Sequence, residues 1–80
     1  MFTARITVSL KKGVADPEGG NTKKALELLG FSHVKGVTTS KVFTMELEED
    51  DIDKAKVSAK EMCERLLANP VIQNYDIEIF

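Results

Sequence analysis

Apolar and polar residues alternate strictly over residues 2–10, where every second position is apolar. The apolar positions are Phe2, Ala4, Ile6, Val8 and Leu10. A period of two places successive side chains on opposite faces of a strand, so this segment predicts a β-strand with one buried face. The same alternation at Tyr75, Ile77 and Ile79 predicts another strand near the end of the sequence.

Two further short strands are predicted in the middle of the chain, at residues 34–39 and 42–47, and the second again alternates between apolar and polar positions. Because only Ser40 and Lys41 separate the two segments, a tight hairpin is the most economical connection. The Asn-Gly or Asp-Gly pair that is typical of such a hairpin is missing, so the type of turn stays open.

A first helix is predicted to begin at Asp16 and to end at Gly30. The Asp16 carboxylate is suited to accept hydrogen bonds from the free amides at a helix start, and Pro17 fits the first helical position. Glu18 complements the positive end of the helix dipole. Gly30 ends an apolar stripe formed by Ala25, Leu26, Leu28 and Leu29.

A second helix is predicted from Asp51 or Asp53 to Ala68. Its apolar residues recur at spacings of three and four, which predicts one buried stripe. These residues are Ala55, Ala59, Met62, Cys63, Leu66 and Leu67. Asn69 and Pro70 end the helix, because the residue before a proline is pushed out of the helical region.

The order strand, helix, strand, strand, helix, strand predicts an α+β chain of the ferredoxin-like, split βαβ type (βαββαβ). Such a fold has a four-stranded antiparallel sheet with two helices on one face. The 80 residues are expected to form a single domain, residues 1–80. Because the core of so small a chain is modest and one cysteine allows no disulfide, we expect it to associate with itself.

The charge balance narrows the range of partners. The chain has 11 Lys and Arg residues against 13 Asp and Glu residues, which gives a formal net charge of -2. Neutralising phosphates requires a basic excess, and base stacking requires outward aromatic side chains on the central strands, so nucleic acid is not expected as a partner. No apolar stretch approaches membrane-spanning length and no leader-like segment opens the sequence, so we expect a soluble, cytoplasmic protein.

Two residues invite a catalytic interpretation. Cys63 and His33 are the only residues of their types, and a Cys–His nucleophile would need both side chains close together. Cys63 falls on the apolar stripe of the second helix, whereas His33 lies in the loop before the second predicted strand. We therefore interpret Cys63 as a small core side chain whose pKa is raised by burial, and a single cysteine provides no thiolate metal site.

The acidic residues 48–53 and the glycine-containing segment 19–23 also have two interpretations each. The acidic residues lack the alternating ligands and the glycine of a calcium loop, so they are expected to cap the second helix. The glycine segment lacks the spacing of a phosphate loop, although helix starts do attract anions. We expect its glycines to permit the close approach of another backbone segment.

The connection after the second helix is unusually apolar. Val71 and Ile72 lie just beyond the helix stop, where polar residues would be ordinary. They either pack beneath the helix end and close the core, or they offer an apolar surface to a partner. The sequence pattern leaves both interpretations open.

Three stretches of the chain resemble one known family. They are residues 8–11 (VSLK), residues 16–19 (DPEG), and residues 61–72 (EMCERLLANPVI) followed by Tyr75. Taken together, and over essentially the whole length, they are similar to PurS, the small subunit of phosphoribosylformylglycinamidine (FGAM) synthase. A match of twelve consecutive residues is far more specific than a short spaced motif.

The resemblance implies a role in a glutamine-dependent carbon–nitrogen ligase of purine biosynthesis. That synthase converts formylglycinamide ribonucleotide (FGAR), ATP and glutamine to FGAM, ADP, phosphate and glutamate. The resemblance implies that a large subunit, PurL, uses ATP and Mg²⁺, and that a glutaminase subunit, PurQ, releases ammonia. PurS is expected to carry no catalytic, cofactor-binding or metal-binding residue, to associate with itself as a homodimer or tetramer, and to bridge PurL and PurQ for ammonia transfer.

The residues themselves are consistent with such an adaptor. Sheet edges with free amides and carbonyls are normally covered or paired, and pairing across a twofold axis is the simplest solution. We therefore expect an edge strand to be buried in the dimer and the connection after the second helix to lie near a partner. The expected partner-binding residues are Leu67, Asn69, Pro70, Val71, Ile72 and Tyr75.

Two other functions share the predicted order of strands and helices. A regulatory domain of the ACT type would bind an amino acid at a dimer interface, near a turn such as the one at Gly13. An acylphosphatase-like enzyme would need an arginine after the first strand, where this sequence has Lys11 and Lys12. The adaptor is the preferred interpretation, with the ACT-like domain as its alternative.

Overall fold

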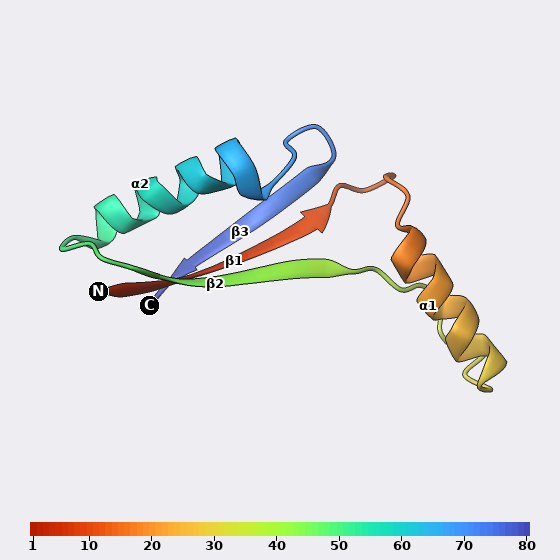
Figure 1. The fold of residues 1–80 in the computed structure, drawn as a ribbon. Helices are drawn as coiled ribbons and strands as arrows, with labels where there is room; N and C mark the ends of the chain where they lie inside the picture. Colours follow the sequence, from red (N-terminus) through yellow and green to blue (C-terminus); the bar gives the residue numbers. More distant parts are fainter.

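The computed structural model describes residues 1–80, which form one antiparallel sheet and two α-helices (Figure 1). In chain order the elements are β1 (Phe2–Leu10), α1 (Pro17–Leu28), β2 (Ser40–Leu47), α2 (Ile52–Met62), the π-helical segment η1 (Cys63–Leu67) and β3 (Gln73–Ile79). The three strands are ordered β2-β1-β3, so β1 is central and both of its neighbours run antiparallel to it. The architecture is α+β.

The predicted four-stranded sheet is wrong, because residues 34–39 form no strand. Backbone groups in this segment contact the start of α1 instead of pairing with a neighbouring strand. The amide of Thr39 donates a hydrogen bond to the carboxylate of Asp16 (2.7 Å). The carbonyl of Val37 lies directly against Gly19. A segment committed in this way is not free to pair with a neighbouring strand.

The hairpin predicted at Ser40 and Lys41 does not form either. These two residues are the first of β2, where they pair with Ser9 and Val8 of β1. The strand predicted from residue 42 therefore begins two residues earlier. The chain returns from α1 through the irregular residues 29–39 rather than through a tight turn.

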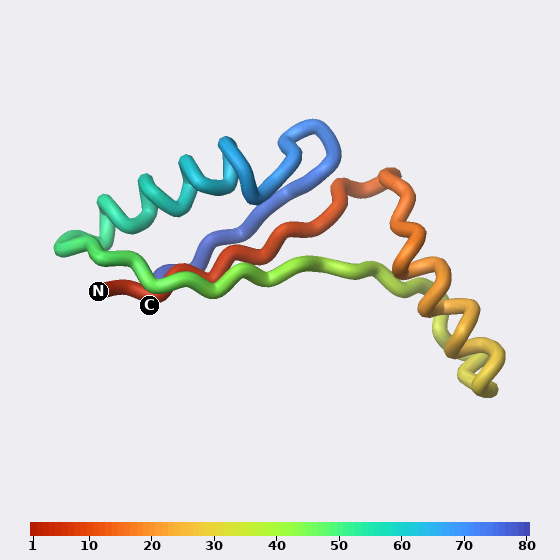
Figure 2. The backbone as a smooth tube through the Cα atoms, in the orientation of Figure 1, coloured from red at the N-terminus to blue at the C-terminus, as the bar shows by residue number.

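The core lies between one face of the sheet and the helix α2, which runs above it (Figures 1 and 2). The buried cluster is formed by Ala4, Ile6, Val8, Ala59, Cys63 and Ala68. Small side chains on α2 and η1 let the helix approach the sheet closely. Half-buried apolar residues of β2 and β3, such as Phe43 and Ile77, extend the core beside Ile6, their partner in the register.

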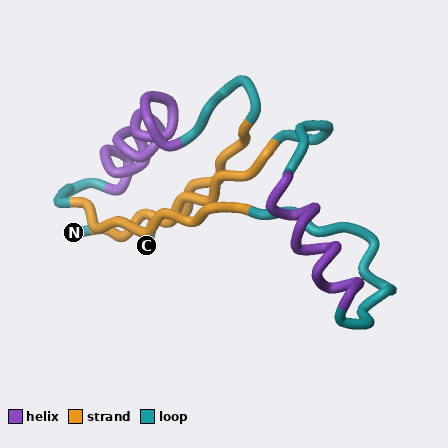
Figure 3. Tube along the Cα trace, turned by 45° about the vertical axis from the view of Figure 1, so that its right-hand side comes forward, coloured by secondary structure: helices purple, strands orange, loops and turns teal.

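The placement of α1 differs from the expectation of two helices on one face. Figures 1 and 3 both show α1 projecting from the end of the sheet. Its apolar residues gather in the last turn, where Leu28 is 89% exposed and Leu29 is 74% exposed. The first turns contain Gly20, Asn21 and Thr22 and offer no apolar stripe to a sheet, so α1 has little to gain from packing there.

The chain is elongated for its size. Its radius of gyration is 16.2 Å, whereas a compact domain of this length has a radius of about 12 Å. Its accessible surface is 6108 Å², roughly 1,300 Å² more than expected for a compact protein of this mass. Only 8 of 80 residues are buried, and no polar or charged residue is among them. The projecting α1 accounts for this shape.

Both helix starts agree with the sequence-based prediction. Asp16 caps α1 and Pro17 is its first residue, while Asp51 caps α2 by accepting from the amide of Asp53 (2.9 Å). The second helix ends as an α-helix at Met62, and its helical turns continue through η1. Neither helix has the length and apolar character that crossing a membrane would need.

Candidate functional site

The connection between η1 and β3, residues 68–72, is held by a dense set of local hydrogen bonds and is called here the Val71 loop. Asn69 organises it. Its side-chain oxygen accepts from the amide of Val71 (3.0 Å), and its carbonyl accepts from the amides of Ile72 (3.2 Å) and Gln73 (2.8 Å). The Gln73 side chain in turn accepts from the amide of Asn69 (2.7 Å). The loop is therefore a built turn with a defined shape.

Lys11, at the end of β1, attaches the Val71 loop to the sheet. Its Nζ donates to the carbonyl of Pro70 (2.8 Å), and its amide donates to the carbonyl of Ile72 (2.8 Å). The Val71 side chain, between these two bonded carbonyls, is 78% exposed. The structure thus presents an apolar side chain on a fixed loop.

The six residues predicted to bind a partner fall into two groups. Val71 and Ile72 are exposed, and Asn69 and Pro70 form the turn that carries them. Leu67 and Tyr75 are half-buried and pack against the core. The structure therefore brings four of the six together on one surface and turns the other two inward. Leu66, which lay outside the predicted set, is 83% exposed.

The Cys63 thiol and the Tyr75 hydroxyl, on η1 and β3, both have raised pKa values and are therefore neutral near pH 7. Burial, and to a lesser degree the nearby Glu64 carboxylate, raise the pKa of the Cys63 thiol. Burial and the same carboxylate also raise the pKa of Tyr75, whose hydroxyl donates to Glu64 at 3.5 Å. The interpretation of Cys63 as a buried side chain with a raised pKa is confirmed. Such a thiol is a poor nucleophile, because only the thiolate attacks.

His33 lies in residues 29–39, which return from the outer end of α1, whereas Cys63 is in the core between the sheet and α2. The His33 ring packs edge-on to Phe31, with their centroids 6.2 Å apart. The structure therefore does not bring His33 and Cys63 together as a catalytic pair.

The acidic residues 48–53 act at the start of α2. Asp51 caps the helix, and Glu49 accepts from the hydroxyl of Ser58 (3.4 Å). This agrees with the predicted capping role. No group of three or more His, Cys, Asp or Glu side chains is arranged to hold a metal ion.

A second built feature lies where α1 leaves the sheet, and it consists of Asp16, Gly19, Val37 and Thr39; it is called here the clasp. One carboxylate oxygen of Asp16 accepts from the amide of Gly19 (2.8 Å) and the other from the amide of Thr39 (2.7 Å). The hydroxyl of Thr39 also donates to this carboxylate (3.0 Å). The bonds with Gly19 and Thr39, chiefly those with their backbone amides, lower the pKa of Asp16.

The glycine segment has one glycine that requires its lack of a side chain. A Cβ on Gly19 would lie 2.2 Å from the carbonyl oxygen of Val37, whereas one on Gly20 would meet nothing within 4 Å. The predicted close approach of another backbone is confirmed for Gly19 alone. Since the Gly19 amide already bonds with Asp16, this helix start has one donor fewer for an anion.

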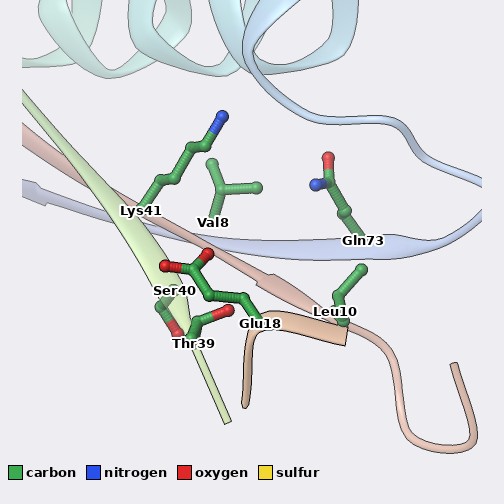
Figure 4. Close-up of a pocket in the computed structure, with 7 residues that line it drawn as sticks. All are labelled: Val8, Leu10, Glu18, Thr39, Ser40, Lys41 and Gln73. Carbon is green, nitrogen blue, oxygen red and sulfur yellow. The ribbon is translucent and has the colours of Figure 1, made fainter. Parts of the chain in front are cut away.

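Beside the clasp, the surface is hollowed over a volume of about 510 Å³ (Figure 4). The hollow is lined by Val8, Leu10, Glu18, Thr39, Ser40, Lys41 and Gln73. Figure 4 shows Val8, Lys41 and Gln73 extending from the sheet toward the side of α2, with the Glu18 carboxylate at the opposite wall near Thr39.

The sequence predicted Asp16 as the cap of the first helix. It did not predict the bonds between Asp16 and Thr39, because no local pattern links residues 23 positions apart.

These features define a class of protein: a small α+β chain with two unpaired sheet edges, a projecting helix and a fixed apolar loop, all suited to contact with other chains. The model of the PurS family, described as phosphoribosylformylglycinamidine (FGAM) synthase, matches residues 3–80. The chain belongs to the PurS family. Its function is that of the PurS subunit of FGAM synthase in purine biosynthesis.

Individual relatives agree with this assignment. The PurS subunit of Archaeoglobus fulgidus is 55% identical over 74 residues, which cover 92% of each chain. The crystal structure of Methanocaldococcus jannaschii PurS, 44% identical, superposes with a TM-score of 0.90 and covers 100% of this chain and 96% of its own. A chain in the structure of PurLQS from Thermotoga maritima is 30% identical, with a TM-score of 0.88 and coverage of 99% and 96%.

The family assignment replaces the two alternative functions. Both the ACT-like domain and the acylphosphatase-like enzyme were inferred from a βαββαβ order, and the three-stranded sheet removes that basis. The turn at Gly13, which the ACT-like interpretation needed as a ligand-binding turn, instead connects β1 to the clasp.

Proposed function

We propose that this chain makes and breaks no bond itself and works as an adaptor in FGAM synthase, in the cytoplasm. In this role it bridges the ATP-dependent subunit PurL and the glutaminase PurQ, and so supports the transfer of ammonia from glutamine to FGAR. The products of the complex are FGAM, ADP, phosphate and glutamate. Support comes from the likeness of the chain to one in the PurLQS structure of Thermotoga maritima.

The state of the chain's own side chains supports the non-catalytic part of this proposal. Its one thiol is buried, and its pKa is raised. The carboxylates of Asp16, Asp51 and Glu49 are engaged in capping and hydrogen bonding. We therefore assign ATP and Mg²⁺ to the large subunit, and no cofactor to this chain.

The observation that carries the adaptor proposal is the incomplete burial of the chain on its own. A standard interface removes about 800 Å² from each partner, and this chain exposes roughly 1,300 Å² more than a compact protein of its mass. The surfaces to be covered are the exposed Leu28 and Leu29 at the end of α1 and the free outer edges of β2 and β3. We infer that the chain forms a homodimer, or a tetramer built from such dimers.

The Val71 loop is the proposed contact with another subunit of the synthase. Leu67, Asn69, Pro70, Val71, Ile72 and Tyr75 are its proposed residues, with Val71 and Ile72 making the contact and the others holding the loop. An apolar side chain on a rigid turn loses little conformational freedom on binding, which favours affinity. The hydrogen bonds of Asn69, Gln73 and Lys11 provide that rigidity.

Reconstitution of the synthase tests the proposal. Purified PurL and PurQ are assayed with and without this chain, with glutamine or with ammonium salt as the nitrogen source. We expect the chain to raise the glutamine-dependent rate at least tenfold and to leave the ammonia-dependent rate within twofold. An equal glutamine-dependent rate without the chain, or turnover of substrate by this chain alone, would overturn the adaptor proposal.

A further inference from the structure

The clasp holds the first turn of α1 against the segment that leads into β2. It connects the first turn of α1, through Asp16 and Gly19, with Val37 and Thr39, which lead into β2. α1 makes no extensive contact with the sheet or with α2. The clasp therefore lies at the joint where α1 leaves the sheet.

The two helix caps of the chain, Asp16 and Asp51, differ in what they connect. Asp51 accepts only from the amide two residues ahead, at Asp53. Asp16 caps its helix in a similar way but also receives the amide and the hydroxyl of Thr39, 23 residues away. Only one of the two caps therefore spans a joint between elements.

Gly19 contributes the second half of the clasp by contact of backbone with backbone. The position it leaves for a Cβ lies 2.2 Å from the Val37 carbonyl oxygen, a separation that no side chain tolerates. Any larger residue must push residue 37 and α1 apart. The clasp therefore combines a polar and a steric feature, which meet at Gly19.

We propose that the clasp is a positioning device that sets the angle of α1 and thereby makes self-association of the chain, and assembly of the synthase, possible. The proposal rests on the proposed function for its second part only. α1 spans about 18 Å, so a rotation of roughly 20° at the clasp moves its outer end by about 6 Å. An interface packed at the density of a protein interior does not absorb such a displacement.

The angle of α1 is measured directly by pulsed electron resonance between spin labels on Ser32→Cys, beyond α1, and Glu46→Cys, on the sheet. Both positions are exposed, the background is Cys63→Ala, and labelled chains are diluted with unlabelled chain. We expect one narrow distance distribution in the parent and a broadened or shifted one in Asp16→Ala and in Gly19→Ala. Asp51→Ala, which removes the other cap, is the matched control and keeps the parent distribution.

The proposed effect of the clasp on self-association and on assembly of the synthase is tested with the same clasp variants, without spin labels. We expect Asp16→Ala and Gly19→Ala to weaken self-association at least tenfold in sedimentation experiments and to lower glutamine-dependent turnover, with Thr39→Val intermediate. Asp16→Asn keeps one acceptor oxygen and should recover part of the loss. Protection of β1 amides from hydrogen exchange should be retained, because the core does not include α1.

The outcomes distinguish this proposal from the proposed function. If wild-type chain fails to stimulate PurL and PurQ, the adaptor function is wrong, while the spin-label distances still decide whether the clasp sets the angle. If the wild type stimulates and both clasp variants keep the parent distances, the clasp is not the positioning device. If the distances change while association and turnover do not, the link from the angle of α1 to assembly is wrong.

Discussion

Lys11 and Pro70 lie 59 positions apart, yet the Nζ of Lys11 donates to the carbonyl of Pro70 at 2.8 Å. The bond joins the end of the central strand to the turn that precedes β3. It fixes the Val71 loop from outside, while Asn69 fixes it from within.

Removing the bond between Lys11 and Pro70 tests whether binding to the other subunits depends on the shape of the Val71 loop. Lys11→Met keeps the length of the side chain but deletes the donor. We expect the free energy of unfolding to fall by about 1 kcal/mol or less, since the bond is at the surface. The affinity for the PurL and PurQ subunits should fall at least threefold, as measured by biolayer interferometry. Lys12→Met, a neighbouring lysine with no such bond, is the control, and equal affinities for the two variants would contradict the role of the loop.

The contact made by Val71 is tested more directly by Val71→Asp. Because the side chain is 78% exposed, we expect the free energy of unfolding to change by about 0.5 kcal/mol or less. Binding to the large subunit should weaken at least tenfold, because a charge would be buried against an apolar contact. Val57→Asp changes another exposed valine, on α2, and should bind like the wild type. Full binding by Val71→Asp would remove the loop from the interface.

The buried thiol gives a prediction about chemistry. Cys63→Ala should cost about 1–2 kcal/mol of unfolding free energy, because it leaves a small cavity in the core. Glutamine-dependent turnover of the reconstituted synthase should stay within twofold of the wild type at a temperature where the variant is folded. Reaction of the native thiol with an alkylating reagent should be slow and should accelerate in urea. A folded but inactive Cys63→Ala would show that the chain does take part in the chemistry.

Because Asp16 is part of the clasp, we expect the angle of α1 to change when its carboxylate is protonated at acidic pH. A carboxyl group whose folded pKa is depressed adds stability above its unfolded pKa of about 3.9, and this stability is lost as the pH falls through the lower folded value. The spin-label distance across the clasp should therefore be constant from neutral pH down to the ordinary carboxyl pKa and broaden only below it. Glu18→Gln, which changes the carboxylate that lines the hollow beside the clasp, should keep this transition, and Asp16→Asn should abolish it. A transition that persists in Asp16→Asn belongs to another group.

Local patterns in the sequence predicted the elements that local physics decides. The alternation of residues 2–10 placed β1, and Asp16 with Pro17 placed the start of α1. The pattern at 34–39 failed because two valines in six residues are equally compatible with an irregular connection. The bond between Asp16 and Thr39, which settles that choice, joins residues far apart in the sequence.

The sequence pattern also did not predict that α1 projects from the sheet. A ferredoxin-like order assumes that every helix covers the sheet of its own chain, but Leu28 and Leu29 are left exposed here. The sequence marks these residues as apolar and does not say which chain covers them. Of the predicted partner-binding residues, Val71 and Ile72 are exposed while Leu67 and Tyr75 pack inward. Their contact with a partner stays a prediction.

Sedimentation velocity of the wild-type chain, from low micromolar to millimolar concentration, tests the central claim most directly. The account predicts a species of at least twice 8.9 kDa at the higher concentrations, with a frictional ratio lower than that of the extended single chain. A monomer of 8.9 kDa at every concentration would contradict it, because the exposed helix and sheet edges would then need no second copy.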